Sequence, residues 1–219
     1  MGCDIHVCCE YRPRESVRCG NGWIEKKLDW HTMDVFQKNL EGEYELLPLY
    51  TDRCYSLFAN LAGVRRYNDE LIIDEPRGLP SDICEDTRKY YESWEKDAHT
   101  CSWFTLWELC DWYNKYGKIK YRGYLTAHDA ARVKQDDWYQ PDCIYESNKD
   151  DATLMLTEWV HNNYALEEFI NKIKQRAEDF CFLFLSEVTR LSEITIEKMK
   201  DIRVVFWFDN EWRNLYEFV

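Results

Sequence analysis

Residues 3–11 alternate between apolar and polar side chains, which is the pattern of a β-strand with two different faces. One face would be apolar and would carry Cys3, Ile5, Val7, Cys9 and Tyr11. The opposite face would present two acids, an imidazole and a thiol, namely Asp4, His6, Cys8 and Glu10. A face exposed only to water seldom needs a cysteine. The pattern therefore predicts a strand that packs on a core with one face and borders a functional site with the other.

The clearest strand of the sequence covers residues 202–209, which read Ile-Arg-Val-Val-Phe-Trp-Phe-Asp. Such a nearly continuous apolar run is typical of a strand that is covered on both faces. Two further strands are expected at 23–30 and 43–50, the first of them after a turn-rich stretch that ends in Asn21-Gly22. The sequence thus predicts strands near both ends of the chain.

Helical patterns fill most of the sequence between these strands. Residues 55–64 have helical spacing that ends near Gly63, and Ser81 would cap a helix that runs to about residue 95. Thr105 and Glu108 form a capping box for a helix that Gly117 ends, and Thr126 opens the next helix in the same manner. Residues 136–150 read as a loop, and a long helical pattern covers 152–180, with shorter helical segments up to residue 200.

The order of strands, then helices, then a strand predicts an α+β protein. We expect a single domain over residues 1–219, with a central, mostly antiparallel sheet that contains the N- and C-terminal strands and with helices packed on it. The last strand should lie beside the first.

The charge balance restricts the partners. A formal net charge of −13 argues against binding of duplex nucleic acid, which needs a basic surface, although a few arginines in a cleft could still attract a small anion. No apolar run approaches the length of a membrane span. Ten cysteines without a CxxC pair or a signal peptide favour free thiols in a reducing compartment, so we expect a cytoplasmic protein.

Two Asp-x-His units suggest a metal site, and they are formed by Asp4, His6, Asp97 and His99. Two imidazoles and one or two carboxylates would suit a divalent Zn²⁺, Mn²⁺ or Fe²⁺ ion with an open position for water. Such an ion would activate the water and polarise a phosphoryl or carbonyl group. In the alternative interpretation, Asp4 and His6 satisfy buried polar groups and His99 supports the start of the helix at Thr105.

Five arginines are candidates for binding an anion: Arg53, Arg65, Arg66, Arg77 and Arg122. Turn-like contexts surround Arg77, Arg122 and the pair Arg65-Arg66. Arg65, Arg77 and Arg122 are the main ligand-binding candidates, together with Ser102 and with Trp103, on which a base could stack. In a chain with 41 acids, each arginine could instead pair with Asp or Glu, and Trp103 could belong to the core. Cys101 is a candidate nucleophile, with a buried inert thiol as the alternative.

Five sequence blocks occur in one order along the chain. They are MGCDIH at residues 1–6, YSLFA leading into AGVR at 55–65, RGLP at 77–80, DAHTCSW at 97–103 and RVVFWFDN at 203–210. As a set, these blocks resemble a family of uncharacterised proteins of bacteriophages and bacteria. That family has Asp-Gly-His-Ser-His-Ser where this chain has residues 97–102, so Cys101 stands in the place of the second histidine. The exchange either keeps a soft metal ligand or means that the position is not a ligand.

The resemblance implies a phage or prophage setting, with action in the host cytoplasm, but no activity. Our leading hypothesis from the residues is a metal-assisted hydrolase of a small phosphorylated or nucleotide-like molecule. Asp4, His6, Asp97 and His99 would act in catalysis and hold the metal. The alternatives are a non-catalytic viral protein that sequesters a nucleotide-type immune signal, and an inhibitor that binds another protein through an aromatic surface.

Overall fold

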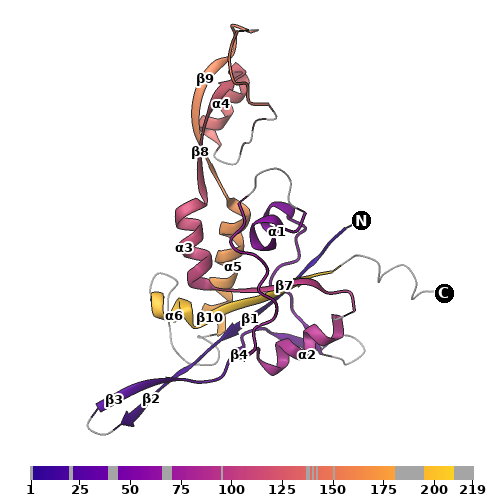
Figure 1. Cartoon of the computed structure of the whole chain (residues 1–219), viewed down its shortest axis with the longest axis vertical. Coiled ribbons are helices and arrows are strands. Elements are labelled where there is room, and N and C mark those ends of the chain that lie inside the picture. The colour runs from indigo at the N-terminus through magenta and orange to yellow at the C-terminus, as the bar shows by residue number, and fades with distance from the viewer. Residues whose placement is uncertain are drawn as a thin grey trace, which may run out of the picture. The chain divides into compact units, whose positions relative to one another are not determined.

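The computed structural model describes residues 2–19, 22–38, 44–65, 71–94, 96–136, 139, 141, 143–149, 151–180 and 195–209 (Figure 1). The strands are β1 (Ile5–Tyr11), β2 (Arg14–Cys19), β3 (Gly22–Lys27), β4 (His31–Thr32), β5 (Phe36–Lys38), β6 (Tyr44–Leu46), β7 (His99–Thr105), β8 (Lys118–Leu125), β9 (Met155–Asn162) and β10 (Ile202–Phe208). The helices are α1 (Tyr55–Ala62), α2 (Glu85–Trp94), α3 (Leu106–Tyr116), α4 (Ala127–Gln135), α5 (Tyr164–Phe180) and α6 (Ile196–Lys200).

The predicted α+β fold is confirmed. Its main sheet has the strand order β4-β1-β10-β7, and every neighbouring pair is antiparallel. As expected, the last strand lies beside the first: Ile5 pairs with Phe208 and Tyr11 with Ile202. By contacts the chain forms two compact units, residues 1–110 with 169–219, and residues 111–168. The single domain expected over residues 1–219 stays a prediction.

The two faces of β1 differ as the sequence pattern predicts. The apolar face, which holds Ile5 and Val7 opposite Phe208 and Phe206, packs on α1, where the rings of Phe58 and Phe208 lie 5.1 Å apart. The polar face is covered too, because α2 lies over it. All seven residues of β10 are buried, as expected for a strand covered on both sides.

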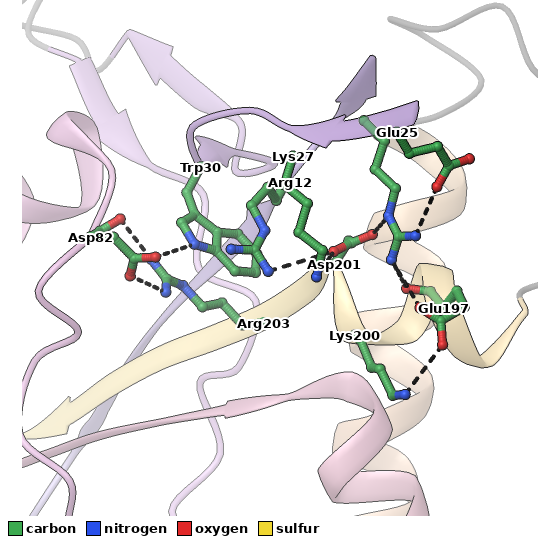
Figure 2. Close-up of polar contacts among 10 residues, drawn as sticks. Arg12, Glu25, Lys27, Trp30, Asp82, Glu197, Lys200, Asp201 and Arg203 are labelled. Carbon is green, nitrogen blue, oxygen red and sulfur yellow. Dashed lines mark hydrogen bonds and ion pairs between the residues drawn. The ribbon is translucent and has the colours of Figure 1, made fainter. Parts of the chain in front are cut away.

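On the polar face of β1, the buried charge of Glu10 is stabilised by an ion pair rather than by contact with water. Glu10 is fully buried and accepts from Arg203 of β10. Arg203 also binds Asp82, before α2, at 2.6 Å (Figure 2). Trp30 contacts the Arg203 guanidinium at 3.9 Å from its ring centre and donates from its indole N–H to Asp82. These contacts connect the sheet to the segment that leads into α2.

Several helix boundaries follow the predicted caps. The backbone of Gly63 has φ +67° at the end of α1, a conformation that glycine adopts without strain. Thr105 and Glu108 form the expected capping box, and the hydroxyl of Thr126 accepts the amide proton of Asp129 in α4. The helix expected from Ser81 begins four residues later, at Glu85.

Other expectations were wrong. Residues 14–19 lie in the predicted turn-rich stretch but form β2, which pairs with β3 as a hairpin. Residues 99–105, which precede the predicted helix and for which no element was predicted, form the edge strand β7. Residues 155–162, expected to be helical, form β9, so His161 lies on a strand. The expected helical segments between 181 and 194 and the residues Arg66 and Asn21 lie outside the described residues.

The unit of residues 111–168 contains a two-stranded antiparallel sheet of β8 and β9, and α4 packs against it. Its small core consists of Leu125, Ala130, Val133 and Trp159. Throughout the described ranges, no helix is both long enough and apolar enough to cross a bilayer.

Candidate functional site

Strand pairing brings candidate residues together at one end of the main sheet. There β1 begins, β7 begins and β10 ends, with Ile5 opposite Phe208 and Phe208 opposite His99. Just beyond the paired residues, the Asp209 amide donates to the Asp4 carbonyl at 3.1 Å, and the Asp4 amide donates to the Asp209 carboxylate at 3.2 Å. Asp4, His6 and His99 therefore gather around Asp209, a residue that the sequence did not single out as a ligand or catalytic group.

His6 is held at both ring nitrogens. Its Nε2 lies 3.0 Å from Asp209 Oδ2, and its Nδ1 lies 3.3 Å from the Tyr90 hydroxyl. The ring also packs against Trp94, at 4.0 Å between centroids, and stacks on Trp207 at 5.6 Å. Since an ionised carboxylate only accepts, the neutral imidazole carries its proton on Nε2, and Nδ1 accepts from Tyr90. Asp209 thus fixes both the orientation and the tautomer of His6.

Charges of both signs meet at this end of the sheet. Arg53 binds Asp4 with two hydrogen bonds, of 2.5 Å from Nε and 3.0 Å from Nη2. Arg65 lies just past the end of α1 and donates to the Gly2 carbonyl at 3.4 Å. The buried thiol of Cys3 lies within the electrostatic influence of both arginines and of Asp4 and Asp209. Two carboxylates, two guanidinium groups and two imidazoles therefore lie at this end of the sheet.

The pKa values reflect this environment. Burial would raise the pKa of Asp209, but hydrogen bonds from His6 and from the Asp4 amide, with the charges of His6 and His99, hold it below its ordinary value. Burial, followed by the charge of Asp209, raises the pKa of Cys3 to about 11, and burial raises that of Tyr90 to about 12. At neutral pH the carboxylate is charged, while the thiol and the phenol keep their protons, so neither is an activated nucleophile.

Two residues next to members of this cluster have a strained backbone. Arg65 has φ +56° and Thr100 has φ +53°, and they are the two non-glycine residues in the left-handed region within the described ranges. A β-branched residue such as Thr100 is a true outlier there. Its hydroxyl lies 2.9 Å from Nδ1 of His99, and the pairing of β10 with β7 is irregular between Phe206 and Phe208. The strain at Thr100 therefore sets how β7 presents His99.

A metal would have to compete for atoms that already have partners. Both ring nitrogens of His6 are hydrogen-bonded, and both carboxylate oxygens of Asp4 bind Arg53. Asp97 lies in the turn after α2, where its amide donates to the Trp94 carbonyl at 2.8 Å. Among the residues that the structure describes, no group of three or more His, Cys, Asp or Glu side chains is arranged to hold a metal ion. The metal site stays a prediction.

The other ligand-binding candidates lie elsewhere. Arg77 forms ion pairs with Asp74 at 3.0 Å and Glu108 at 2.9 Å, and it donates to the Trp103 carbonyl. Its backbone N–H donates to the Ser102 hydroxyl, so Arg77, Ser102 and Trp103 do form one cluster. Two acids bind the one guanidinium of Arg77. This geometry agrees with the alternative interpretation, in which the arginine pairs with acidic side chains and has a structural role. Arg122 belongs to the unit of residues 111–168 and lies 3.4 Å from Glu158.

A second charged cluster surrounds Asp201, directly before β10 (Figure 2). The nearly buried carboxylate faces Arg12 at 3.6 Å and Lys27 at 3.4 Å, and it accepts from Arg14. Arg14 also binds Glu25 and Glu197. Lys200 binds Glu197 as well, so four cations and three acids meet here. Their ion pairs attach the β2–β3 hairpin to the start of β10.

The sequence missed Asp209, Tyr90 and Trp94 as functional residues. Asp209 ends the predicted strand 202–209, so its place beside Asp4 follows once that strand is paired with the first. Tyr90 and Trp94 are one helical turn apart on α2, which was a detectable signal for two rings on one helix face.

Comparison of the chain with family models, with curated proteins and with solved structures gives no match in any of the three. The resemblance to the bacteriophage and bacterial family therefore stays a prediction. The protein is an α+β protein in which charged and aromatic side chains gather at one end of the main sheet.

Proposed function

We propose that the protein binds a small anionic, nucleotide-like molecule at this end of the sheet and holds it without chemical change. The observation that carries the proposal is the strained backbone at Arg65, which binds the Gly2 carbonyl, and at Thr100, which contacts His99. Strain at non-glycine residues costs about 1–3 kcal/mol each and is found mainly at ligand and active sites. The strain holds Arg65 and His99, which are two cationic or potentially cationic groups, beside the cluster.

The Arg53–Asp4 ion pair supports exchange with a phosphate. Both side chains are about two-fifths exposed, at 44% and 41%, so water already screens their attraction. A phosphate offers the guanidinium a fork of two oxygens like that of the carboxylate, with more negative charge. Arg53 can therefore turn from Asp4 to a ligand at small cost, and Arg65 would supply a second guanidinium.

The rings beside His6 support a planar group on the ligand. Trp94 and Tyr90 are half-buried on α2, and His6 lies against both. An aromatic base gains about 1–3 kcal/mol by stacking on such a ring. Phosphate-binding and base-stacking groups thus occur within one cluster, as a nucleotide-like molecule requires.

Hydrolysis is the second candidate function, and the Asp209–His6 pair favours it. A carboxylate that fixes the tautomer of a histidine is the arrangement that general bases use. His6 would accept a proton from water at Nδ1 after Tyr90 moves away. In the metal-assisted form, Asp4, His6, Asp97 and His99 would hold Zn²⁺, Mn²⁺ or Fe²⁺, and Tyr90 and Arg53 would have to release His6 and Asp4.

The experiment is titration calorimetry of the full chain with inorganic phosphate and with mono-, di-, tri- and cyclic nucleotides. We expect one nucleotide class to bind at one equivalent and to lose at least tenfold in affinity in Arg65→Ala. The matched control is Arg18→Ala, because Arg18 is exposed on β2, outside this cluster. Circular dichroism of each variant confirms that it is folded.

The ligand recovered after denaturation separates the two candidates. Intact nucleotide supports binding without turnover, and a hydrolysed product that disappears in His6→Ala supports the enzyme. Elemental analysis of untagged protein, with His6→Ala and His99→Ala, tests the metal directly. If no nucleotide binds, or if Arg65→Ala and Arg18→Ala bind equally well, both proposals for this site are wrong.

A further inference from the structure

The β8–β9 sheet of residues 111–168 has an edge whose hydrogen-bonding groups point outward. At the end of β8, the N–H and C=O of Tyr124 both bond to Tyr145, each at 3.0 Å, on the side away from β9. In an antiparallel sheet, every second residue directs its N–H and C=O to the same edge. Arg122, Lys120 and Lys118 therefore direct theirs to the edge that Tyr145 begins to cover. Among the described residues, Tyr124–Tyr145 is the one pairing recorded at that edge.

The same three residues make one face of this edge strongly basic. Because side chains alternate along a strand, Lys118, Lys120 and Arg122 share a face, and successive members are about 6.6–7 Å apart. All three are exposed. Arg122 faces Glu158 at 3.4 Å, with side-chain exposures of 68% and 73%, whereas neither lysine has an ion pair within the described part of the chain. A chain of net charge −13 thus presents a local row of positive charge.

Apolar side chains accompany the basic row. Across β9, Leu156 and Val160 lie opposite Tyr124 and Lys120 on the same face, and both are exposed, by 50% and 39%. Ile144 and Tyr145, at the covered end of the edge, are 46% and 43% exposed. Lysines at the edge of a sheet can serve only to prevent it from pairing with other chains, but exposed apolar side chains beside them would favour binding. Moreover, a sheet of two strands is marginal in stability, so a third strand would strengthen it.

We propose that this edge binds an extended acidic segment of another protein, which adds to β8 as an antiparallel third strand. The segment continues the pairing that Tyr145 starts, and it places an acidic side chain opposite each of Lys118, Lys120 and Arg122. Backbone hydrogen bonds supply affinity and the alternating acids supply specificity, as in other cases of strand addition. This inference is independent of the nucleotide site, because it concerns the other compact unit of the chain.

The test is fluorescence anisotropy of a labelled peptide with the full chain. The probe is an eight-residue peptide of alternating Glu and Val, matched to the eight residues of β8. A second peptide has the same composition, with its four glutamates adjacent. We expect the alternating peptide to bind at least tenfold more tightly than the second one, and N-methylation of its backbone on one edge to abolish binding.

Variants locate the site on the chain. Lys118→Gln/Lys120→Gln, which removes both positive charges but keeps polar, unbranched side chains, should weaken binding of the alternating peptide at least tenfold, while Arg18→Gln on the exposed β2 should not. Equal binding of the two peptides, or of a single-stranded oligonucleotide in preference to both, would overturn the proposal. Absence of peptide binding to the folded wild-type chain would also overturn it and would leave the lysines as edge protection.

Discussion

Arg203 of β10 and Glu10 of β1 form an ion pair that water does not reach. Nη2 of Arg203 lies 2.6 Å from Oε2 of Glu10, and their side chains are 2% and 0% exposed. The second carboxylate oxygen of Glu10 accepts the amide proton of Cys84, just before α2. One buried carboxylate therefore joins two central strands to the helix that covers them.

Loss of the Glu10 charge should be strongly destabilising. In Glu10→Gln, the buried guanidinium of Arg203 keeps Asp82 as its one anionic partner among the described residues, and we expect the free energy of unfolding to fall by about 3 kcal/mol or more. Urea denaturation followed by circular dichroism measures the change. Glu85→Gln is the control, because its ion pair with Lys89 is on the surface, and its midpoint should match that of the wild type. Equal midpoints for all three proteins would contradict the expectation.

The buried carboxyl of Asp34 should make stability depend on pH. Burial raises its pKa from 3.8 to about 7, against the opposing effects of the Cys9 amide and Arg176. Between these two values, the folded protein keeps a proton that the unfolded chain has lost. The free energy of unfolding therefore falls as the pH rises from about 4 to about 7, by an amount on the order of a few kcal/mol.

Denaturation of the wild type and of Asp34→Asn at pH 4.5, 6 and 7.5 tests this effect of Asp34. The asparagine can still accept from the Cys9 amide but does not titrate. As the pH rises across this range, the wild type should lose unfolding free energy relative to Asp34→Asn, so the variant should be relatively more stable at pH 7.5 than at pH 4.5. A difference that stays constant with pH would show that Asp34 has an ordinary pKa.

Gly117 ends α3 at a position without room for a side chain. A Cβ there would lie 2.6 Å from the Tyr113 carbonyl oxygen, a backbone atom that cannot rotate away. We expect Gly117→Ala to lower the free energy of unfolding by about 1–3 kcal/mol, measured by thermal denaturation. Gly22→Ala is the matched control, since a Cβ there would lie 4.0 Å from the Cys19 carbonyl oxygen, an ordinary contact. Equal melting temperatures for both variants and the wild type would contradict this expectation and would mean that the backbone at residue 117 shifts to make room for the Cβ.

Native cysteines should react in the order of their exposure. The nine described cysteines are free, as the sequence predicts, and four of them are buried, namely Cys3, Cys8, Cys9 and Cys84. Burial raises the pKa of each of these four thiols, which leaves little reactive thiolate. Iodoacetamide with mass spectrometry should label the exposed Cys19 and Cys143 first and the buried four only in urea. Early labelling of Cys8 or Cys9 would contradict this order.

The sequence predicted those elements that are defined by local signals, such as alternation of apolar and polar residues, a continuous apolar run or a helix cap. β1, β10 and the capping box of α3 are of this kind. β9 lies within residues 152–180, which the sequence predicted to be helical. In the structure, Trp159 is buried while Leu156 and Val160 are exposed, so tertiary packing overrode the pattern.

The site was predictable only in part, for a related reason. Asp4 and His6 were recognised from one strand, but their partner Asp209 lies more than 200 positions away and arrives through strand pairing. Arg77 and Arg65 looked alike in sequence. Arg77 is neutralised by Asp74 and Glu108. These pairings depend on how α3 and the loop before α2 pack together, which the sequence pattern does not show.

The position of β10 between β1 and β7 has a consequence for biosynthesis. A ribosome adds about 5–20 residues per second, so β1 and β7 are complete well before the strand that joins them has been made. During that interval both strands have an unpaired edge, and the imidazole of His6 lacks its carboxylate. Assembly of the main sheet must therefore follow translation of residue 208, and a nascent chain stalled earlier would depend on chaperones.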